Sequence, residues 1–184
     1  MSYATVTEAV EAVARAVLPP ERVPLSEWAD RHRRLSSEGS VQPGAWQSFP
    51  FQREVLDAIS PQSGYEQVVL VWASQMGKSE ALLCLIGFVI AEQPGPVLVV
   101  QPTLSMAEAF SKDRVSSMFR DMPVLKGKVA DPKSRDAGST IYHRRFLGGH
   151  VTIVGANSAA GLASRPIRRR WRSRGPGRSG IARS

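Results

Sequence analysis

From residue 50 onward, the hydrophobic positions form blocks whose spacing alternates between that of helices and that of strands. The first block, 50–60, opens with a proline, which suits the first turn of a helix. Its helical spacing predicts one apolar side that faces the core, formed by Phe51, Val55, Leu56 and Ile59. The blocks that follow predict a strand, a buried helix, a strand and a further helix, in this order: 65–73, 78–93, 96–103 and 104–121.

This alternation predicts an α/β fold in which helices cover a parallel sheet. Two more strands are expected at 140–149 and 150–157, joined through Gly148 and Gly149. The stretch 122–139 is rich in Lys, Asp, Pro, Gly and Ser, which is typical of a surface excursion. The sheet-bearing domain is therefore expected to span 50–167.

A helical N-terminal arm, residues 1–49, is expected before this domain. The stretch TVTEAVEAVARAVLPP at 5–20 carries valines at helical spacing and ends in two prolines, which predicts an amphipathic helix. A short second helix is expected near Pro24, with Ser26 as its N-cap. Trp28 and Leu35 are expected to hold this arm on the core.

The positive charge of the chain is concentrated near its C-terminus. The net charge is +8, but the last acidic residue is Asp136, and eight of the 24 Lys and Arg residues lie in 165–184. The tail 168–184 is poor in apolar residues and is expected to be disordered.

Cys84 is the single cysteine, which excludes an intramolecular disulfide and a cysteine-based zinc cluster. It lies in an apolar run at 81–91, where we expect a plain core residue.

The same apolar run is too short to span a bilayer. The N-terminus lacks the basic start, apolar stretch and cleavage site of a secretory signal. We therefore expect a cytoplasmic protein with no membrane segment. The three histidines are too scattered along the chain to predict a metal site.

The stretch WASQMGKSE at 72–80 carries the candidate chemistry. It ends in Gly77-Lys78-Ser79, like a phosphate-binding loop of the form G-x-x-x-x-G-K-[ST], but Trp72 stands where that pattern has its first glycine. The tripeptide lies between a predicted strand and a predicted helix, where backbone N–H groups at a helix start can hold phosphates. The alternative is a strand-to-helix turn that contains lysine and serine by chance.

In the phosphate-binding interpretation, Lys78 reaches the β- and γ-phosphates of ATP, and the Ser79 hydroxyl joins the Mg²⁺ shell. The predicted ATP-binding residues of the loop are Ser74, Gln75, Met76, Gly77, Lys78 and Ser79.

Four separated stretches resemble, in the right order, the N-terminal ATPase region of the large terminase subunit of tailed phages, in the lambda-like GpA family. The resemblance runs from about residue 24 to residue 169 and rests on SEWADRHRRLSSEGSVQPGAWQSFPFQREVLDAI, VVLVWASQMGKSEALL, VLVVQPTLSMAEAFSKDRVSSMF and GANSAAGLASRPIRR. It implies a P-loop NTPase-type α/β fold and a deviant phosphate loop without the first glycine. It also implies that Gln52 contacts adenine, with a solvent-facing helix residue as the alternative.

The resemblance further implies ATP and Mg²⁺ as cofactors and a motor that pumps double-stranded DNA into a capsid. A small terminase subunit and the capsid portal are the partners in the intact family. In that family an apolar strand ending in Asp-Glu follows the SRPIR segment, to hold Mg²⁺ and orient water, and a nuclease domain lies nearer the C-terminus.

Here SRPIR at 164–168 is followed by RRWRSRGPGRSGIARS, without a carboxylate. We therefore expect a partial, truncated ATPase domain that lacks the acidic strand and the nuclease, binds nucleotide weakly and turns it over negligibly. The abrupt change of composition favours a shifted reading frame for the tail. A real arginine-rich arm that neutralises DNA phosphates is the alternative.

Two other functions fit parts of the sequence. A helicase-like nucleic-acid-dependent ATPase would also use the phosphate loop and Gln52. A non-enzymatic basic DNA-binding protein would instead depend on the tail, so that deletion of 168–184 would abolish its affinity for DNA.

Overall fold

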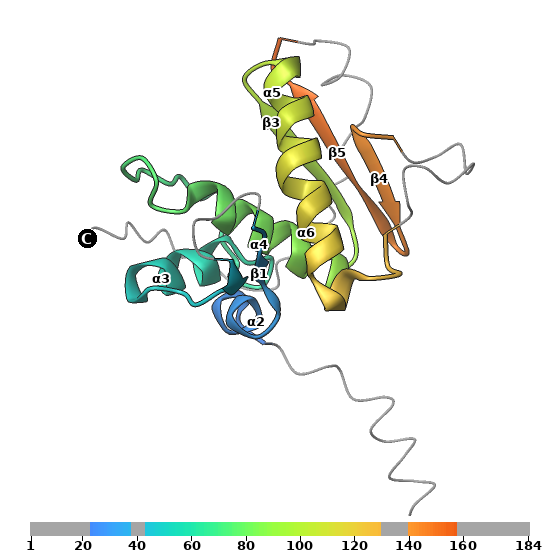
Figure 1. Ribbon diagram of the computed structural model, residues 1–184. Coiled ribbons are helices and arrows are strands. Elements are labelled where there is room, and N and C mark those ends of the chain that lie inside the picture. Colours follow the sequence, from blue (N-terminus) through green and yellow to red (C-terminus); the bar gives the residue numbers. More distant parts are fainter. Residues whose placement is uncertain (1–22, 38–42, 130–139, 158–184) are drawn as a thin grey trace, which may run out of the picture.

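The computed structural model describes residues 23–37, 43–129 and 140–157 (Figure 1). The helix predicted at 5–20 and the tail 168–184 lie outside these residues. In chain order the elements are α2 (Leu25–His32), β1 (Arg34–Leu35), β2 (Gly44–Ala45), α3 (Pro50–Ile59), α4 (Lys78–Ala91), β3 (Pro96–Gln101), α5 (Leu104–Ala109), η1 (Phe110–Val115), α6 (Ser116–Asp121), η2 (Pro123–Leu125), β4 (His143–Phe146) and β5 (Gly149–Gly155).

The larger sheet contains three strands in the order β3-β5-β4. Strands β3 and β5 are parallel, with Val99 opposite Ile153, whereas β4 is antiparallel to β5. The α/β prediction is confirmed, but the sheet is mixed and not purely parallel. Only Leu147 and Gly148 separate β4 from β5, and so short a connection can join only antiparallel strands. Gly148 has a φ of 85°, which suits this tight turn.

The helix predicted at 104–121 is present as one continuous column built from α5, η1 and α6, which crosses a face of the sheet (Figure 1). Thr103 caps its start, because its side chain accepts a hydrogen bond from the Met106 backbone N–H at 3.2 Å. The middle part, η1, is a π-helix. Serine side chains bond back to the backbone there, including Ser116 Oγ to the Ser111 carbonyl at 2.9 Å, a contact known to distort helices.

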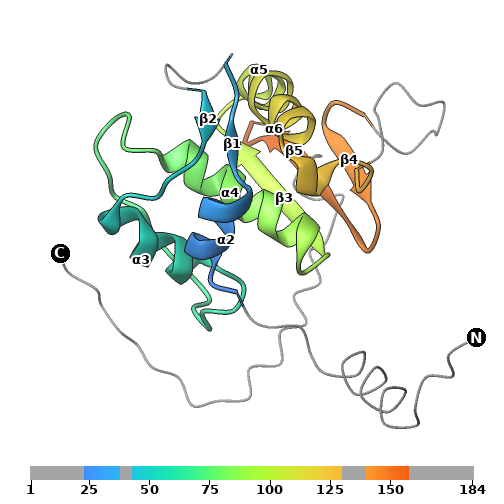
Figure 2. The same cartoon turned by 60° about the horizontal axis from the view of Figure 1, so that its bottom comes forward.

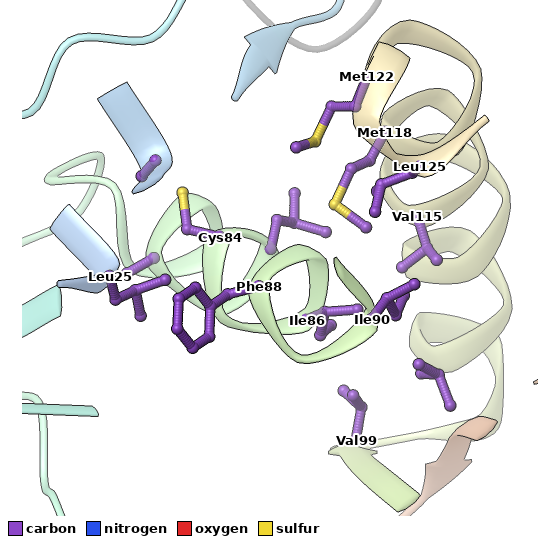
Figure 3. Close-up of a cluster of buried hydrophobic side chains, with 14 of the residues drawn as sticks. Leu25, Cys84, Ile86, Phe88, Ile90, Val99, Val115, Met118, Met122 and Leu125 are labelled. Carbon is purple, nitrogen blue, oxygen red and sulfur yellow. The ribbon is translucent and has the colours of Figure 1, made fainter. Parts of the chain in front are cut away.

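Helix α4 lies between α2 and α3 on one side and the helical column with β3 on the other, as both views show (Figures 1 and 2). Its sequence is apolar on nearly every side, as expected for a helix that is buried all round. Phe88 faces Leu25 of α2, while Ile86 and Ile90 face Val115 and Val99 (Figure 3). This helix therefore joins the N-terminal segment and the sheet into one core.

The expected role of Trp28 is confirmed. Its ring packs edge-to-face on Phe88, with ring centres 5.6 Å apart, and its Nε1 donates to Glu92 Oε1 at 3.0 Å. The prediction that Ser26 caps α2 is wrong, because the residue before the helix is Pro24. Instead, the Ser26 backbone N–H and hydroxyl both donate to the Asp57 carboxylate of α3, at 2.9 and 3.0 Å. These contacts fasten α2 to α3.

The strand predicted at 65–73 is not formed. This segment pairs with none of the described strands, and its valines face solvent, with Val69 72% and Val71 88% exposed. A β-branched run becomes a strand only when a neighbour accepts and donates its backbone hydrogen bonds. The described part of the chain places no such neighbour beside 65–73. No helix among the described residues is long and apolar enough to cross a membrane.

Candidate phosphate-binding site

The loop at 72–77 is followed directly by helix α4, which begins at Lys78. Gln75 and Gly77 both have positive φ values, 61° and 92°, so the chain turns sharply before it enters the helix. The first backbone N–H groups of a helix have no partner within it, and here Gly77 supplies no side chain that could cap them. Residues Ser74, Gln75, Met76, Lys78 and Ser79 are exposed. The start of α4 thus has no side-chain cap and lies among exposed residues, as an anion site requires.

The ammonium group of Lys78 lies over this loop. Its Nζ donates to the carbonyl oxygens of Trp72 and Ala73, both at 2.8 Å. The cation therefore already sits beside the residues that the sequence predicts to surround a phosphate chain. Neutral carbonyls are weaker partners for an ammonium group than charged phosphate oxygens, so a phosphate can replace them.

Gln52 fastens the loop to helix α3. Its side chain is buried, its Oε1 accepts from the Phe49 backbone N–H at 3.0 Å, and its Nε2 donates to the Met76 carbonyl at 3.1 Å. A Cβ at Gly77 would lie only 2.9 Å from Gln52 Nε2. Gly77 is thus required both by its φ and by this close approach. The predicted adenine contact of Gln52 stays a prediction, since one N–H and one lone pair of its amide remain for other partners.

Two arginines surround Glu80, the residue after Ser79. Arg33 Nη2 lies 2.6 Å from one carboxylate oxygen and Arg114 Nη1 lies 3.4 Å from the other. They offset a negative charge that would otherwise repel an anion at the start of α4. The sequence contains no local signal for this cluster, because Arg33 and Arg114 are 47 and 34 residues from Glu80.

Three aromatic side chains lie together at the N-terminal end of α3, beside the start of the loop at 72–77. The rings of Phe49 and Phe51 are stacked at 5.8 Å, and Phe51 meets Trp72 edge-on, also at 5.8 Å. The predicted core side of 50–60 is therefore wrong for Phe51, which is 46% exposed, and right for Leu56, which is fully buried. Helical periodicity placed Phe51 on the same face as Leu56, but the first turn of α3 extends beyond the edge of the core.

The residues present fit a triphosphate and allow one protein ligand to its metal ion. Ser79 is exposed at the first turn of α4, and Mg²⁺ usually takes most of its ligands from phosphates and water. The described residues contain no group of three or more His, Cys, Asp or Glu side chains that could hold a metal by themselves.

Cys84 plays no part in this chemistry. It is fully buried in α4, as expected, and this burial raises the pKa of its thiol from 9.0 to about 12. A thiol with that pKa stays protonated at neutral pH and is not a nucleophile.

Comparison with known families matches residues 40–170 to the family described as phage terminase large subunit gpA, ATPase domain. The terminase large subunit of Escherichia phage lambda is 31% identical over 141 residues, which cover 76% of this chain and 22% of that protein. The terminase large subunit of Enterobacteria phage P21 is 30% identical over 129 residues, covering 69% of this chain and 20% of that protein. The chain thus spans about a fifth of the length of these curated relatives. No solved structure matches it.

Proposed function

Because the chain belongs to the family of the phage terminase large subunit gpA ATPase domain, we propose that it is the nucleotide-binding part of a DNA-packaging motor. The loop 74–79 binds the triphosphate of ATP through backbone N–H groups and the Lys78 ammonium group. The Ser79 hydroxyl is the protein ligand of the accompanying Mg²⁺. Double-stranded DNA, a small terminase subunit and a capsid portal are the partners of the motor as a whole.

The observation that carries this proposal is the position of Lys78. Its Nζ already lies against the Trp72 and Ala73 carbonyl oxygens, at the loop that leads into α4. A cation and a row of helix-start N–H groups around one turn are complementary to a chain of phosphates. Gln52 holds this turn in place from the neighbouring helix, so little ordering is required when the anion binds.

The residues around the loop favour nucleotide binding over hydrolysis. Phosphoryl transfer to water requires a group that orients the attacking water. Glu80 is the acidic side chain next to the loop, and Arg33 and Arg114 hold its carboxylate. We therefore propose that the chain by itself binds nucleotide without appreciable turnover. A bound Mg²⁺ supplies charge neutralisation for the phosphates.

Family membership favours the motor over the helicase-like ATPase and over the basic DNA-binding protein that the sequence also allowed. In the motor interpretation, nucleotide affinity depends on the loop and not on the tail. Deletion of 168–184 is accordingly expected to leave nucleotide affinity unchanged.

Calorimetric titration of the full chain with MgATP and with magnesium tripolyphosphate tests the proposal. We expect both to bind, and Lys78→Ala to weaken both by at least tenfold, because a charge-assisted contact contributes about 1.5–3 kcal/mol. Lys126→Ala is the matched control, since Lys126 is an exposed lysine in the turn after η2. Equal affinities for wild type and Lys78→Ala would refute the proposed site.

A further inference from the structure

We propose that His143 and His150 form a binding site for one divalent transition-metal ion on the hairpin made by β4 and β5. The centres of the two imidazole rings lie 4.9 Å apart, and the ring planes are tilted by 48°. The spacing of the histidines along the sequence did not predict this pair, because it forms only when the chain reverses between the two strands. The site lies outside the loop at 72–77 and its ion binds without nucleotide.

The register of the hairpin places both imidazoles on one face of the sheet. His143 lies opposite Thr152, two positions from His150 along β5, so the two histidines are diagonal neighbours. Arg144, the residue after His143, faces the helical column, where its Nη2 donates to Ser116 Oγ at 2.9 Å. Because side chains alternate along a strand, the histidines lie on the opposite face. Both are half-buried, so neighbours hold the rings while solvent still reaches them.

The distance between the rings is that of two imidazoles on one ion. A metal ion about 2.0–2.1 Å from one nitrogen of each ring separates the ring centres by roughly 4.5–5.2 Å, for bond angles from square-planar to tetrahedral. The observed 4.9 Å falls within this interval. The χ2 torsion of histidine has a broad energy profile, so a small rotation can point one nitrogen of each ring at a common ion.

Thr152 orients one of the two ligands. Its buried hydroxyl lies 2.9 Å from His143 Nδ1. When an ion binds Nε2 of this ring, Nδ1 carries the proton and donates a hydrogen bond to Thr152 Oγ1, just as metal-binding histidines usually donate their other N–H to an oxygen atom. The hydroxyl therefore determines the tautomer of His143 and reduces the ordering that metal binding requires.

The ligands select the class of ion. Imidazole nitrogens suit Cu²⁺, Ni²⁺ and Zn²⁺, whereas Mg²⁺ prefers oxygen ligands, so this site differs in chemistry from the Mg²⁺ site proposed at Ser79. Two protein ligands leave the other positions of the ion to water. Arg145, which is exposed and lies opposite His150, adds a positive charge that solvent and salt screen. Among the three ions, Cu²⁺ is expected to bind most tightly.

Calorimetric titration of the full chain with CuCl₂, NiCl₂ and MgCl₂, without nucleotide, tests the site. We expect Cu²⁺ and Ni²⁺ to bind, and His143→Gln and His150→Gln each to weaken this binding at least about tenfold, because each removes one ligand bond. Binding of Mg²⁺ is expected to be the same in both variants and wild type. His32→Gln is the matched control, since the ring of His32 packs on Trp28 of α2 and not on a second histidine.

Electron paramagnetic resonance of the chain with Cu²⁺ counts the nitrogens bound to the ion. Two imidazole nitrogens are expected in wild type and one in each single variant. Fewer than two in wild type would refute the site, even if a variant failed to fold. Equal Cu²⁺ affinities of wild type and both variants would refute it as well, and so would an equal loss of affinity in His32→Gln.

The ion is also expected to stabilise the hairpin, because it binds both strands at once. At a free Cu²⁺ concentration 100 times the dissociation constant, the ratio of unfolded to folded chain should fall about 100-fold. Urea unfolding with and without Cu²⁺ measures this change, and the double variant His143→Gln with His150→Gln should not show it. An equal stabilisation of the double variant would place the ion elsewhere and overturn the proposal.

Discussion

The Arg33 guanidinium lies 2.6 Å from the Glu80 carboxylate and joins the N-terminal segment to α4, the helix that follows the loop at 72–77. Arg33 is almost fully buried and Glu80 is mostly so, with 4% and 18% of their side chains exposed. Glu80 is the third residue of α4, so its position determines how the first turn of that helix is oriented. The ion pair therefore supports both the stability of the chain and the geometry of the loop.

Replacement of Glu80 by alanine is expected to destabilise the chain by about 3 kcal/mol, because it leaves the Arg33 charge buried without its partner. Urea unfolding monitored by circular dichroism measures the change. Glu27→Ala is the matched control: Glu27 is likewise the third residue of its helix, but it forms an exposed pair with Arg31. Loss of that pair is expected to cost less than about 1 kcal/mol. Equal changes in unfolding free energy for the two substitutions would show that the buried pair stabilises the chain no more than the exposed pair does.

Gly77→Ala is expected to destabilise the chain more than Gly64→Ala. Both glycines have positive φ, 92° and 79°, so both substitutions incur a backbone cost of roughly 1–2 kcal/mol. A Cβ at Gly64 meets no atom within 4 Å, whereas one at Gly77 lies 2.9 Å from Gln52 Nε2. The difference between the two unfolding free energies isolates the contact with Gln52. Identical losses of unfolding free energy for the two variants would mean that the loop shifts away from Gln52 without an energetic cost.

Gln52→Ala is expected to release the loop at 72–77 from α3. The substitution removes the hydrogen bond to the Met76 carbonyl and the one that caps the start of α3. Amide hydrogen exchange at 74–79 should then become faster even without nucleotide, while exchange in β5 stays unchanged. If Gln52 acted only by contacting a base, its loss would alter exchange in the loop only when ATP is present.

Stability is expected to fall as the pH rises above 9, in part because of Cys84. The pKa of its thiol in the folded chain, about 12, lies above its ordinary value of 9.0. The contribution of the thiol is therefore complete below pH 9 and is lost progressively between pH 9 and 12. Between pH 7 and pH 10 the wild type should lose roughly 1 kcal/mol more stability than Cys84→Ala does. Parallel pH profiles of the two proteins, measured by urea unfolding, would contradict this.

Val69→Lys together with Val71→Lys is expected to reduce aggregation without lowering the unfolding free energy. Both valines are largely exposed, so their substitution removes no packing contact from the core. The β-branched run at 65–73 remains available for pairing with another chain, and charges oppose such pairing. Light scattering during a thermal ramp measures aggregation. A loss of more than about 1 kcal/mol in stability would indicate that the valines are buried in solution.

Periodicity alone predicted most helices and the strands β3, β4 and β5, because each has a local pattern that matches its environment. Helix α4 is apolar all round and lies in the centre of the core. The same reasoning failed for Phe51 and for 65–73. Periodicity identifies a face or a β-branched run, but whether that face meets a core or that run meets a strand depends on distant residues.

The sequence by itself determined the family, the position of the loop at the start of a helix, and which residues are candidates for holding phosphate. The loop and its candidate residues are local properties, since Gly77, Lys78 and Ser79 and the helix after them lie within one short stretch, whereas the family is recognised from several stretches between residues 24 and 169. Only the tertiary structure decided that Gln52 fastens the loop, that Arg33 offsets Glu80, and that three aromatic rings meet beside it. Each of these contacts joins residues that are distant along the chain, and the packing of α2 and α3 on α4 brings them together.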